Sequence, residues 1–566
     1  MAAAPSARLA APPALLIMQS PDGAQSYWEL RKQEAREAGP ATQDYWRQAP
    51  LGSLWKIFSY LYLQQQKIAE NPYQCQGRDL EQEAYCCESG QSIQRQAALA
   101  RSCGLYFEPA RWQITAQDWR QFWQQALADA PHWLLTLPAK RGLQQAALNI
   151  SPEELLRLMA KLPPAWRDDL RQGLLDVSLH GTARELLPVS GSAPRLKTWT
   201  WRDPQDKHRR ISGAMGFLPD GSLFWLGGPG SSQHFLPAYS AAFTQVWQQA
   251  MRLPEIRHSA SYKGEECVDV HFYKRYPLRQ VLQRKDGAWR AAASGPLQGE
   301  YQLHFEHGKQ LQIRLESPLH LLQKQGRWQI HGRMALNDYV ARVVEREGQG
   351  AQAGQAAAAY ALAVAARSYL WQNGQFHGGC RSIADDTRHQ RVLAARPAHA
   401  ALQAAWFTDG LLLDGAAVQY HLDAARPGVM SWRLAQQQAR AGWDFTRILR
   451  HVWPQAQLAS VHGAKACERL SQSEAWLAQK LPRWRSRLQT ETGFEDLPAA
   501  PHICLLDYGN PYSDQRSMRM YVRSGQGLED KLNIAHEYLH LAFKRHPRGV
   551  DEAWLEHKAR ELVEGL

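Results

Sequence analysis

Two histidines and a glutamate near the end of the chain have the spacing of a metal-binding helix. The stretch NIAHEYLHLAF, residues 533–543, contains His536, Glu537 and His540 within an apolar run. Positions four residues apart lie on one face of a helix, so both imidazoles could bind one tetrahedral zinc ion. Glu537 could take a proton from a zinc-bound water, whose pKa the metal lowers toward about 7. The pattern predicts a hydrolytic zinc site; the alternative is a structural helix with two hydrogen-bonded histidines.

Zinc needs a third protein ligand, and the last helical segment can supply one. The stretch DEAWLEHKAR places Glu552 and Glu556 one helical turn apart. It resembles the zincins, many of which take a ligand from a glutamate on the next helix. The resemblance implies that Glu552 is the ligand and that Glu556 orients a ligand histidine. Asp551 and Glu556 remain alternative ligands.

A second pattern that could do chemistry lies near the start of the chain, in APLGSLWKIFSYLYL. Ser53 and Lys56 form an S-x-x-K sequence, which at the start of a helix places a hydroxyl and an amine one turn apart. A buried lysine with a lowered pKa could then activate the serine as a nucleophile. Because S-x-x-K is common by itself, it indicates a catalytic serine only in combination with the motifs that follow.

The order of the following motifs resembles that of penicillin-binding proteins and serine β-lactamases. Ser102 in ALARSCGLYF stands where a second active-site serine is expected, and Lys197 and Thr198 begin the sequence K-T-W-T. The stretch GFLPDGSLFWLGG then predicts a closing strand pair. The resemblance covers residues 14–250 and implies a serine transpeptidase-like α/β domain in which these residues surround the acyl site.

Two residues depart from this pattern. Gly104 stands in place of the usual asparagine, and Trp199 stands in place of the glycine of K-T-G. A tryptophan beside the oxyanion strand is expected to crowd a peptide substrate. The domain could therefore acylate poorly at Ser53 or only bind its ligand.

The middle of the chain resembles the sporulation stage II protein D (SpoIID/LytB) domain, whose active members are peptidoglycan lytic transglycosylases. The resemblance spans residues 260–460 and rests on LNDYVARVVERE, YALAVAARSYL, DDTRHQRV and PGVMSWRLAQQQARAGWDF. It implies that Glu347 protonates a glycosidic oxygen, which requires a raised pKa and a partly apolar cleft. It also implies a groove lined in part by Arg367, His389 and Gln390. The usual E-M-P reads E-G-Q here, so a structural domain with a lapsed site is the alternative.

Length, composition and charge exclude several classes of protein. At 566 residues the chain is too long for one core, and with 44% hydrophobic residues it is not a disordered chain. The net charge of +12 is dispersed rather than gathered in a Lys/Arg run, so no nucleic-acid partner is expected. No run of 18 apolar residues occurs, so no transmembrane segment is expected either.

The cysteines indicate the compartment. Four of the eight crowd into one stretch, which predicts two disulfides and an oxidising periplasm; buried free thiols in a cytosolic protein are the alternative. The start, MAAAPSARLAAPPALLIMQ, is a poor signal peptide, so export is not evident from it. The crowded four are Cys75, Cys86, Cys87 and Cys103, and the scattered ones are Cys267, Cys380, Cys467 and Cys504.

Helical and strand periodicity predicts the elements that position these motifs. Helices are expected at 152–162, 240–251, 356–372, 528–546 and 551–565, hairpins at 216–228 and 301–317, and a strand at 501–509. The predicted fold class is multidomain α+β. It comprises a transpeptidase-like α/β domain over 14–250, a SpoIID-like mixed domain over 255–462, and a small, mostly helical zincin-like domain over 465–566.

A chain with all three modules is similar to the YfaQ family of Gram-negative bacteria, which is regarded as periplasmic and has no proven reaction. Two modules independently indicate peptidoglycan as the partner, through its stem peptides and glycan strands, and envelope proteins are the other candidate. The function expected is that of a cell-envelope protein that acts on or recognises peptidoglycan, with a C-terminal zinc-dependent peptidase site. The alternative is a non-catalytic peptidoglycan-binding or surveillance protein with degenerate enzyme domains.

Overall fold

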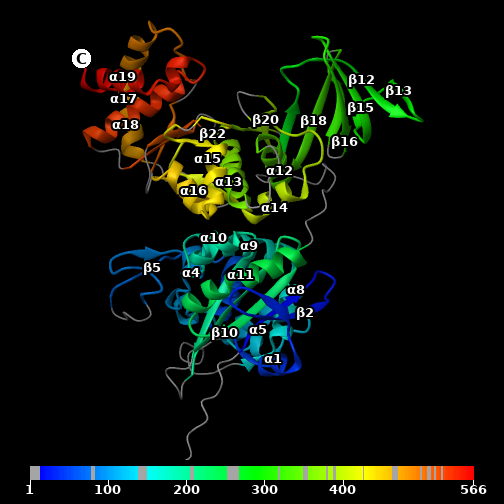
Figure 1. Cartoon of the computed structure of the whole chain (residues 1–566). Coiled ribbons are helices and arrows are strands. Elements are labelled where there is room, and N and C mark those ends of the chain that lie inside the picture. Colours follow the sequence, from blue (N-terminus) through cyan, green and yellow to red (C-terminus); the bar gives the residue numbers. More distant parts are fainter. Residues whose placement is uncertain are drawn as a thin grey trace, which may run out of the picture. The chain divides into compact units, whose positions relative to one another are not determined.

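The helices and strands of this computed structural model gather into two units, Met1–Pro254 and Glu255–Leu566, each with sheets and helices of its own (Figure 1). The protein is therefore a multidomain α+β protein. Among the described residues, no helix has the length and apolar character needed to cross a membrane. The structure describes residues 13–77, 83–137, 149–203, 210–251, 267–316, 319–324, 326–348, 355–377, 380–386, 390–424, 426–461, 470–497, 500–505, 511–514, 518–523 and 527–565.

An antiparallel sheet organises the first unit, with the strand order β3-β2-β1-β10-β9-β8. All six residues of β1 (Ala14–Gln19) are buried, as are all but the first of β9 (Arg210–Phe217), so both faces of the sheet are covered. The hairpin predicted at 216–228 is confirmed, because β9 turns into β10 (Leu223–Pro229) there. The remaining strands are β2 (Gln25–Leu30), β3 (Ala35–Glu37) and β8 (Arg195–Arg202).

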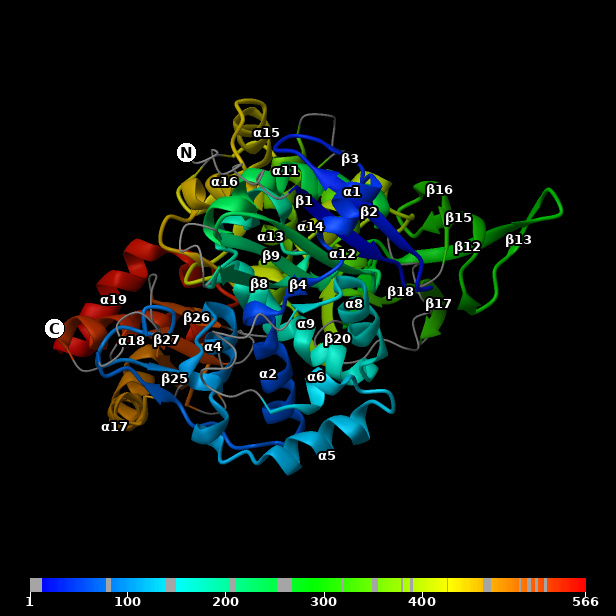
Figure 2. The same cartoon turned by 90° about the horizontal axis from the view of Figure 1, so that it is seen from below.

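Helices cover this sheet and hold the S-x-x-K motif. Helix α8 (Pro152–Lys161) packs against β1 and β10, α9 (Pro164–Leu179) against β8, and α11 (Ser232–Ala250) against β9. Helix α2 (Trp55–Gln65) contacts both α4 (Arg95–Arg101) and α9 (Figure 2). Its residues 56–63 are all buried, as expected for a helix enclosed on every side. The other helices include α1 (Pro40–Tyr45), α5 (Ala116–Ala126), α6 (His132–Leu135) and α10 (Leu187–Ser190).

A larger sheet begins the second unit, with the strand order β16-β15-β12-β18-β11-β20-β19 and with β17 also paired to β18. The hairpin predicted at 301–317 is confirmed as β15 and β16. The strands are β11 (Cys267–Phe272), β12 (Leu278–Lys285), β13 (Ala288–Ala291), β14 (Gly295–Pro296), β15 (Gly299–Phe305), β16 (Gln310–Leu315), β17 (Leu319–Lys324), β18 (Arg327–Ala335), β19 (Gln375–His377) and β20 (Cys380–Ala384).

The alanine-rich helix α13 (Ala356–Asn373) is the centre of the helices that follow this sheet. It contacts α12 (Leu336–Glu347), α14 (His399–Phe407), α15 (Trp432–Arg440) and α16 (Phe445–Val452). Two short strand pairs lie beside them: β21 (Leu411–Asp414) with β24 (Gln457–Ser460), and β22 (Gln419–His421) with β23 (Val429–Ser431).

Three long helices and a small sheet form the C-terminal part. Helices α17 (Ser471–Leu488), α18 (Leu528–Ala542) and α19 (Glu552–Glu564) share a core with a sheet in the order β25-β27-β26. The predicted strand at 501–509 is β25 (His502–Leu505), and the sequence analysis missed its partners β26 (Tyr512–Asp514) and β27 (Arg519–Val522).

The disulfides predicted for the N-terminal cysteines are confirmed. Cys75 pairs with Cys87, and Cys86 pairs with Cys103. A third disulfide joins Cys267 on β11 to Cys380 on β20, and the sequence analysis did not predict it. Only the parallel pairing of those two strands brings these cysteines together across 113 residues. Cys504 is also disulfide-bonded, and Cys467 lies outside the described residues.

Removing the Cys267–Cys380 disulfide by alanine substitution is expected to destabilise the second unit by about 2–5 kcal/mol. This disulfide closes a loop of 113 residues, whereas Cys75–Cys87 closes one of 12. In the chain-entropy model, the longer loop restricts the unfolded chain more. Calorimetric unfolding of the two double variants measures the difference; an equal or larger loss for Cys75→Ala/Cys87→Ala would contradict this account.

Candidate functional site

Helix α18 presents His536 and His540 on a half-buried face, while its opposite face belongs to the core. Ile534, Tyr538 and Leu539 are fully buried there against the other C-terminal helices and strands. Because the apolar residues hold the helix by that face, both imidazoles must point toward α19. The packing of α18 against α19 thus positions the candidate metal ligands.

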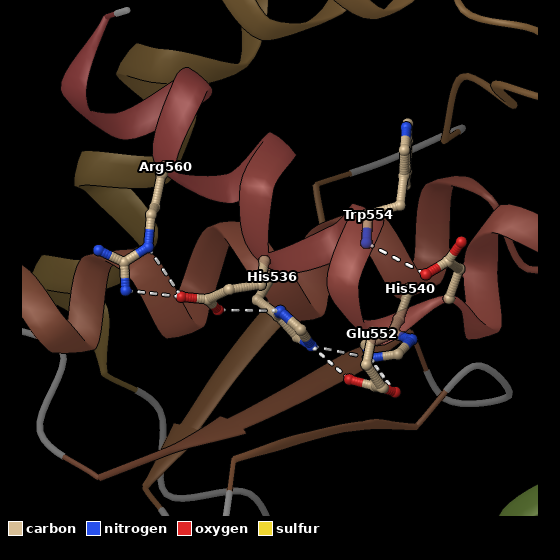
Figure 3. A network of polar contacts seen from close by, with 7 residues as sticks. His536, His540, Glu552, Trp554 and Arg560 are labelled. Atoms are coloured by element: carbon tan, nitrogen blue, oxygen red, sulfur yellow. Dashed lines mark hydrogen bonds and ion pairs between the residues drawn. The ribbon is translucent and has the colours of Figure 1, made fainter.

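Three potential ligand atoms converge between α18 and α19 (Figure 3). The Nε2 atoms of His536 and His540 are 3.1 Å apart. The carboxylate of Glu552 lies 3.1 Å from His536 Nε2 and 3.7 Å from His540 Nε2. Two nitrogens bound at about 2.0–2.1 Å to one tetrahedral zinc would be separated by about 3.3 Å, so this spacing fits a single ion.

The three acidic residues that could supply the third ligand make different contacts in the structure. Glu552 is the one whose carboxylate faces both imidazole Nε2 atoms. Asp551 caps α19 by accepting a hydrogen bond of 3.2 Å from Trp554 N. Glu556 pairs with Arg560 at 2.8 Å and lies 3.7 Å from His536 Nδ1, on the far side of that ring.

The outer nitrogens of both rings face oxygen acceptors. His540 Nδ1 lies 2.8 Å from the carbonyl oxygen of Gly549, so it donates its proton there. His536 Nδ1 faces the Glu556 carboxylate. With their protons on Nδ1, both rings direct Nε2 lone pairs toward the Glu552 carboxylate. Such a set of nitrogen and oxygen donors suits a divalent cation that neutralises their mutual repulsion.

Glu537 points inward beside this cluster and is only 5% exposed. One of its oxygens and the ligand atoms of His536 and His540 all lie within 4.8 Å of one another. Burial raises its pKa, although the two histidines and a hydrogen bond from Ser513 act in the opposite direction. A carboxylate in this place could move a proton at the cluster.

In the first unit, the structure brings together four of the predicted residues. Lys56 Nζ lies 3.2 Å from both Ser53 Oγ and Ser102 Oγ. Lys197 Nζ donates to Ser102 Oγ at 2.9 Å and to the carbonyl oxygen of Thr198 at 3.1 Å. Two serines and two lysines therefore form one hydrogen-bonded row, with Ser53 from the 3₁₀ turn Gly52–Leu54 before α2, Lys56 from α2, Ser102 from just after α4 and Lys197 from strand β8.

Burial changes the acid–base properties of this row. It lowers the pKa of Lys56 to about 7, because the charged amine is removed from water. Burial and the neighbouring charge of Lys56 hold the pKa of Lys197 well below its usual value. Near neutral pH a substantial fraction of Lys56 is therefore an uncharged amine that can accept the Ser53 proton.

The two departures from the motif pattern have different consequences. The expectation that Trp199 crowds a ligand is wrong, since its indole is 1% exposed and stacks on Trp225. Trp199 fills the core because the sheet is covered on both faces. A Cβ at Gly104, by contrast, would lie 3.8 Å from Lys56 Cε. The usual asparagine would thus stand next to the amine, and here it is missing.

Glu347 ends helix α12 and is partly exposed. Its carboxylate accepts a hydrogen bond of 2.8 Å from Arg391 N. Burial raises its pKa, while that hydrogen bond and nearby positive charges lower it. Tyr420 lies close enough for the charge of Glu347 to contribute to its raised pKa. A carboxylic acid with a raised pKa can donate a proton to a leaving oxygen.

The prediction that Arg367 and Gln390 line a groove beside Glu347 is wrong, because both are completely buried. Arg367 donates to the carbonyl oxygens of Leu411 and Ala405 and so ties together the helices around α13. Gln390 donates to Tyr420 Oη at 2.6 Å and to the carbonyl oxygen of Ala366 at 3.0 Å, and it accepts a hydrogen bond from Tyr339 Oη. His389 lies outside the described residues.

A cavity of about 1050 Å³ borders strand β8, and the sequence analysis missed it. It lies between the disulfide-bonded loop, the turn after α9 and the start of α11. Thr182 of that turn is hydrogen-bonded to Thr198, and Ser232 of α11 accepts from Thr200 at 3.2 Å. Because its walls come from three distant segments, no local pattern could have revealed it. Charged residues among those lining it are Glu83, Glu88, Arg101, Arg184 and Glu185.

Comparison with known families matches two models. Residues 77–208 and 428–548 match a family described as "Predicted secreted protein (DUF2300)". Residues 324–409 match the SpoIID family, described as "Stage II sporulation protein". The match to a predicted secreted family agrees with the periplasmic localisation expected for the chain, and the disulfides suit that oxidising compartment.

The solved structures that match this chain have low sequence identity to it and low TM-scores. A class D β-lactamase from Bacillus subtilis is 14% identical, with a TM-score of 0.28, over 42% of this chain and 90% of that one. The transpeptidase domain of a D,D-transpeptidase from Legionella pneumophila is 13% identical, with a TM-score of 0.28, over 42% of this chain and 90% of that one. At these TM-scores the likeness carries no argument.

A curated relative covers nearly the whole chain. It is the "Uncharacterized protein YfaQ" of Escherichia coli (strain K12), and 36% of residues are identical over 515 positions. The alignment spans 91% of this chain and 89% of that protein. The chain belongs to the YfaQ family.

Proposed function

We propose that the protein is a zinc-dependent peptidase of the periplasm that acts on the peptides of peptidoglycan. The observation that supports this most is the convergence of His536 Nε2, His540 Nε2 and the Glu552 carboxylate within 3.1–3.7 Å of one another. Histidine and carboxylate ligands with one position left open are typical of catalytic rather than structural zinc sites.

In this mechanism His536, His540 and Glu552 would hold the ion, which supplies a Lewis acid for the scissile carbonyl. Glu537 would take the proton of the attacking water and pass it to the leaving amine. Its burial keeps this carboxylate in a water-poor environment, which raises its pKa. Glu556 and the carbonyl of Gly549 would keep the two imidazoles oriented.

The small sheet supplies a surface for an extended substrate. Strand β26 lies at the edge of that sheet among the described residues and contacts α18. Its residue Ser513 donates a hydrogen bond to Glu537. An extended peptide could add to this edge by main-chain hydrogen bonds, with a peptide bond near Glu537.

The other two modules favour peptidoglycan over other peptides. Ser53, Lys56, Ser102 and Lys197 form the row expected of a site for stem peptides, and Glu347 has the raised pKa expected of an acid that cleaves glycan strands. If both modules bind peptidoglycan, they would hold the peptidase close to the cross-links of that polymer.

Incubation with purified murein, followed by mass spectrometry of the muropeptides, tests this function. We expect shortened stem peptides or lost cross-links, abolished by a chelator and restored by zinc. Casein serves as the control substrate. Cleavage of casein but not murein would replace the substrate with envelope proteins, and chelator-resistant cleavage would exclude the zinc mechanism.

A second candidate is a protein that binds peptidoglycan without cutting it. The glycine at position 104 favours this, because it leaves Lys56 without the neighbouring amide that the penicillin-binding pattern would provide. Murein cleavage separates the two candidates, and labelling of Ser53 by a penicillin tests whether the transpeptidase-like module can form an acyl-enzyme.

We expect a fluorescent penicillin to label Ser53 covalently, with a rate that rises about tenfold between pH 6 and pH 8. The rise follows from the pKa of Lys56, about 7, since only the uncharged amine can accept the serine proton. Ser53→Ala should abolish labelling, and Ser59→Ala, on the helix α2 that follows Ser53, should not. No labelling of the wild-type protein at any pH would mean that the transpeptidase-like module binds its ligand without acylation.

A further inference from the structure

Strand β26 of the small sheet carries neighbouring side chains that face in two directions. Ser513 lies opposite Met520, which is completely buried in the C-terminal core, and Ser513 donates a hydrogen bond to Glu537. Successive side chains of a strand point to opposite faces of the sheet. Tyr512 therefore points to the other face, away from the core and from Glu537.

The Tyr512 side chain meets a carboxylate that comes from outside the C-terminal part. Its hydroxyl donates a hydrogen bond of 2.9 Å to Asp414 Oδ1, at the end of strand β21 in the same unit. Its ring stacks on that of Tyr521, its direct partner on β27, with the ring centroids 4.7 Å apart. The stacked rings and the hydrogen bond together hold the Asp414 carboxylate next to β26.

The negative charge of Asp414 is not paired within the described part of the chain. Gly415 N also donates to Asp414 Oδ1, at 2.9 Å, so both hydrogen bonds of the side chain use the same oxygen. No described residue donates to Oδ2, and no described lysine, arginine or histidine forms an ion pair with the carboxylate. The side chain is half-buried, where a negative charge attracts a cation more strongly than it does in open water.

An extended peptide that adds to the edge of β26 would bring one of its side chains beside Tyr512. Directly opposite residues of paired strands project from the same face, with Cβ atoms about 4.5–5.5 Å apart. The side chain of the peptide residue opposite Tyr512 would therefore run alongside the tyrosine ring toward Asp414. An amine on a flexible four-carbon stem, as in lysine, could reach the carboxylate from there.

From this arrangement we infer that Asp414 is a specificity-determining residue of the proposed peptidase and selects peptides that carry a side-chain amine beside the scissile bond. The inference rests on the proposed function and names the substrate class of the same site. Stem peptides in which a diamino acid keeps its side-chain amine free belong to this class. An ion pair with Asp414 would fix the register of such a peptide on β26, while Glu537 acts from the other face of the sheet.

A purely structural role of Asp414 would explain its two hydrogen bonds equally well. In that role the side chain would tie β21 to β26 and would need no charge, because an amide oxygen can accept the same two hydrogen bonds. Asp414→Asn distinguishes the two roles, since asparagine keeps the size and the acceptor and removes only the charge.

The experiment uses the zinc-loaded full-length chain and the purified muropeptide that it cleaves fastest, in native form and with its side-chain amine acetylated. The wild-type protein should cleave the native form with a kcat/KM at least about fivefold above that for the acetylated form. Asp414→Asn should remove this preference by lowering kcat/KM for the native form alone. Asp423→Asn, which changes an exposed aspartate of the same unit, is the matched control and should leave the preference as it is.

Tyr512→Phe is a second variant, for use also if Asp414→Asn does not fold. It keeps the ring that stacks on Tyr521 and removes the hydrogen bond to Asp414, so the preference should fall while zinc content stays unchanged. A wild-type protein that cleaves no muropeptide would exclude the proposed function and this inference with it. Equal cleavage of the two forms by the wild-type protein, or a preference that survives in folded Asp414→Asn, would overturn the inference alone and leave the peptidase in place.

Discussion

Replacing Glu537 with glutamine should abolish peptide cleavage while the C-terminal zinc content stays unchanged. General acid–base catalysis contributes about 10²–10⁴-fold, so a loss of that size in kcat is expected. Glutamine keeps the size of the side chain and can still hydrogen-bond Ser513, but it cannot accept the proton of the attacking water. Muropeptide release and elemental analysis of the same sample measure the two effects together.

The matched control for Glu537→Gln is Glu529→Gln, which changes an exposed glutamate in the first turn of the same helix. It should leave cleavage, zinc content and thermal unfolding as they are. Because Glu537 is 5% exposed, its variant also needs an unfolding measurement. A folded, zinc-loaded Glu537→Gln protein with undiminished turnover would exclude this residue as the base.

The double variant His536→Ala/His540→Ala is expected to hold one zinc fewer per chain than the wild-type protein. Both imidazoles are removed from the cluster, whereas the apolar face of α18 that packs in the core is unchanged. The chain should therefore remain folded without this metal. Zinc at 1,000 times its Kd would stabilise the wild-type C-terminal part by about 4 kcal/mol, and the variant should lack this gain.

Two single variants refine this second prediction. Glu552→Ala should also lower zinc affinity, since its carboxylate faces both imidazoles. Asp551→Ala should keep zinc and lose about 1 kcal/mol of stability through the missing cap of α19. His557→Ala, an exposed histidine on α19, is the control. Equal zinc content in the wild-type and double-variant proteins would show that the pair does not bind it.

Short-range patterns in the sequence determined the local parts of both sites. The pairing of His536 with His540 follows from 3.6 residues per turn, and the pairing of Ser53 with Lys56 follows from the same geometry. The two hairpins and the crowded disulfides were equally predictable, because the residues involved lie close along the chain. In each case backbone periodicity or a short loop determines the contact, and no packing between distant segments is needed.

Tertiary structure decided the features that depend on distant segments. It separated Glu552, which faces the histidines, from Asp551, which caps the helix, although the two are adjacent in sequence. It also placed Trp199 and Arg367 inside the core rather than in a groove. Trp199 lies on a sheet that is covered on both faces, and Arg367 lies on helix α13, which other helices enclose, so burial at both positions depends on packing between distant segments.

The same reason applies to the contacts that the sequence analysis did not anticipate. Cys267 meets Cys380, and His271 meets His331, through strands that pair far apart along the chain. Residue type alone showed that the cysteines could form disulfides and that the histidines could form hydrogen bonds or bind a metal. Strand order and register, which the packing of the whole unit selects, determined their partners.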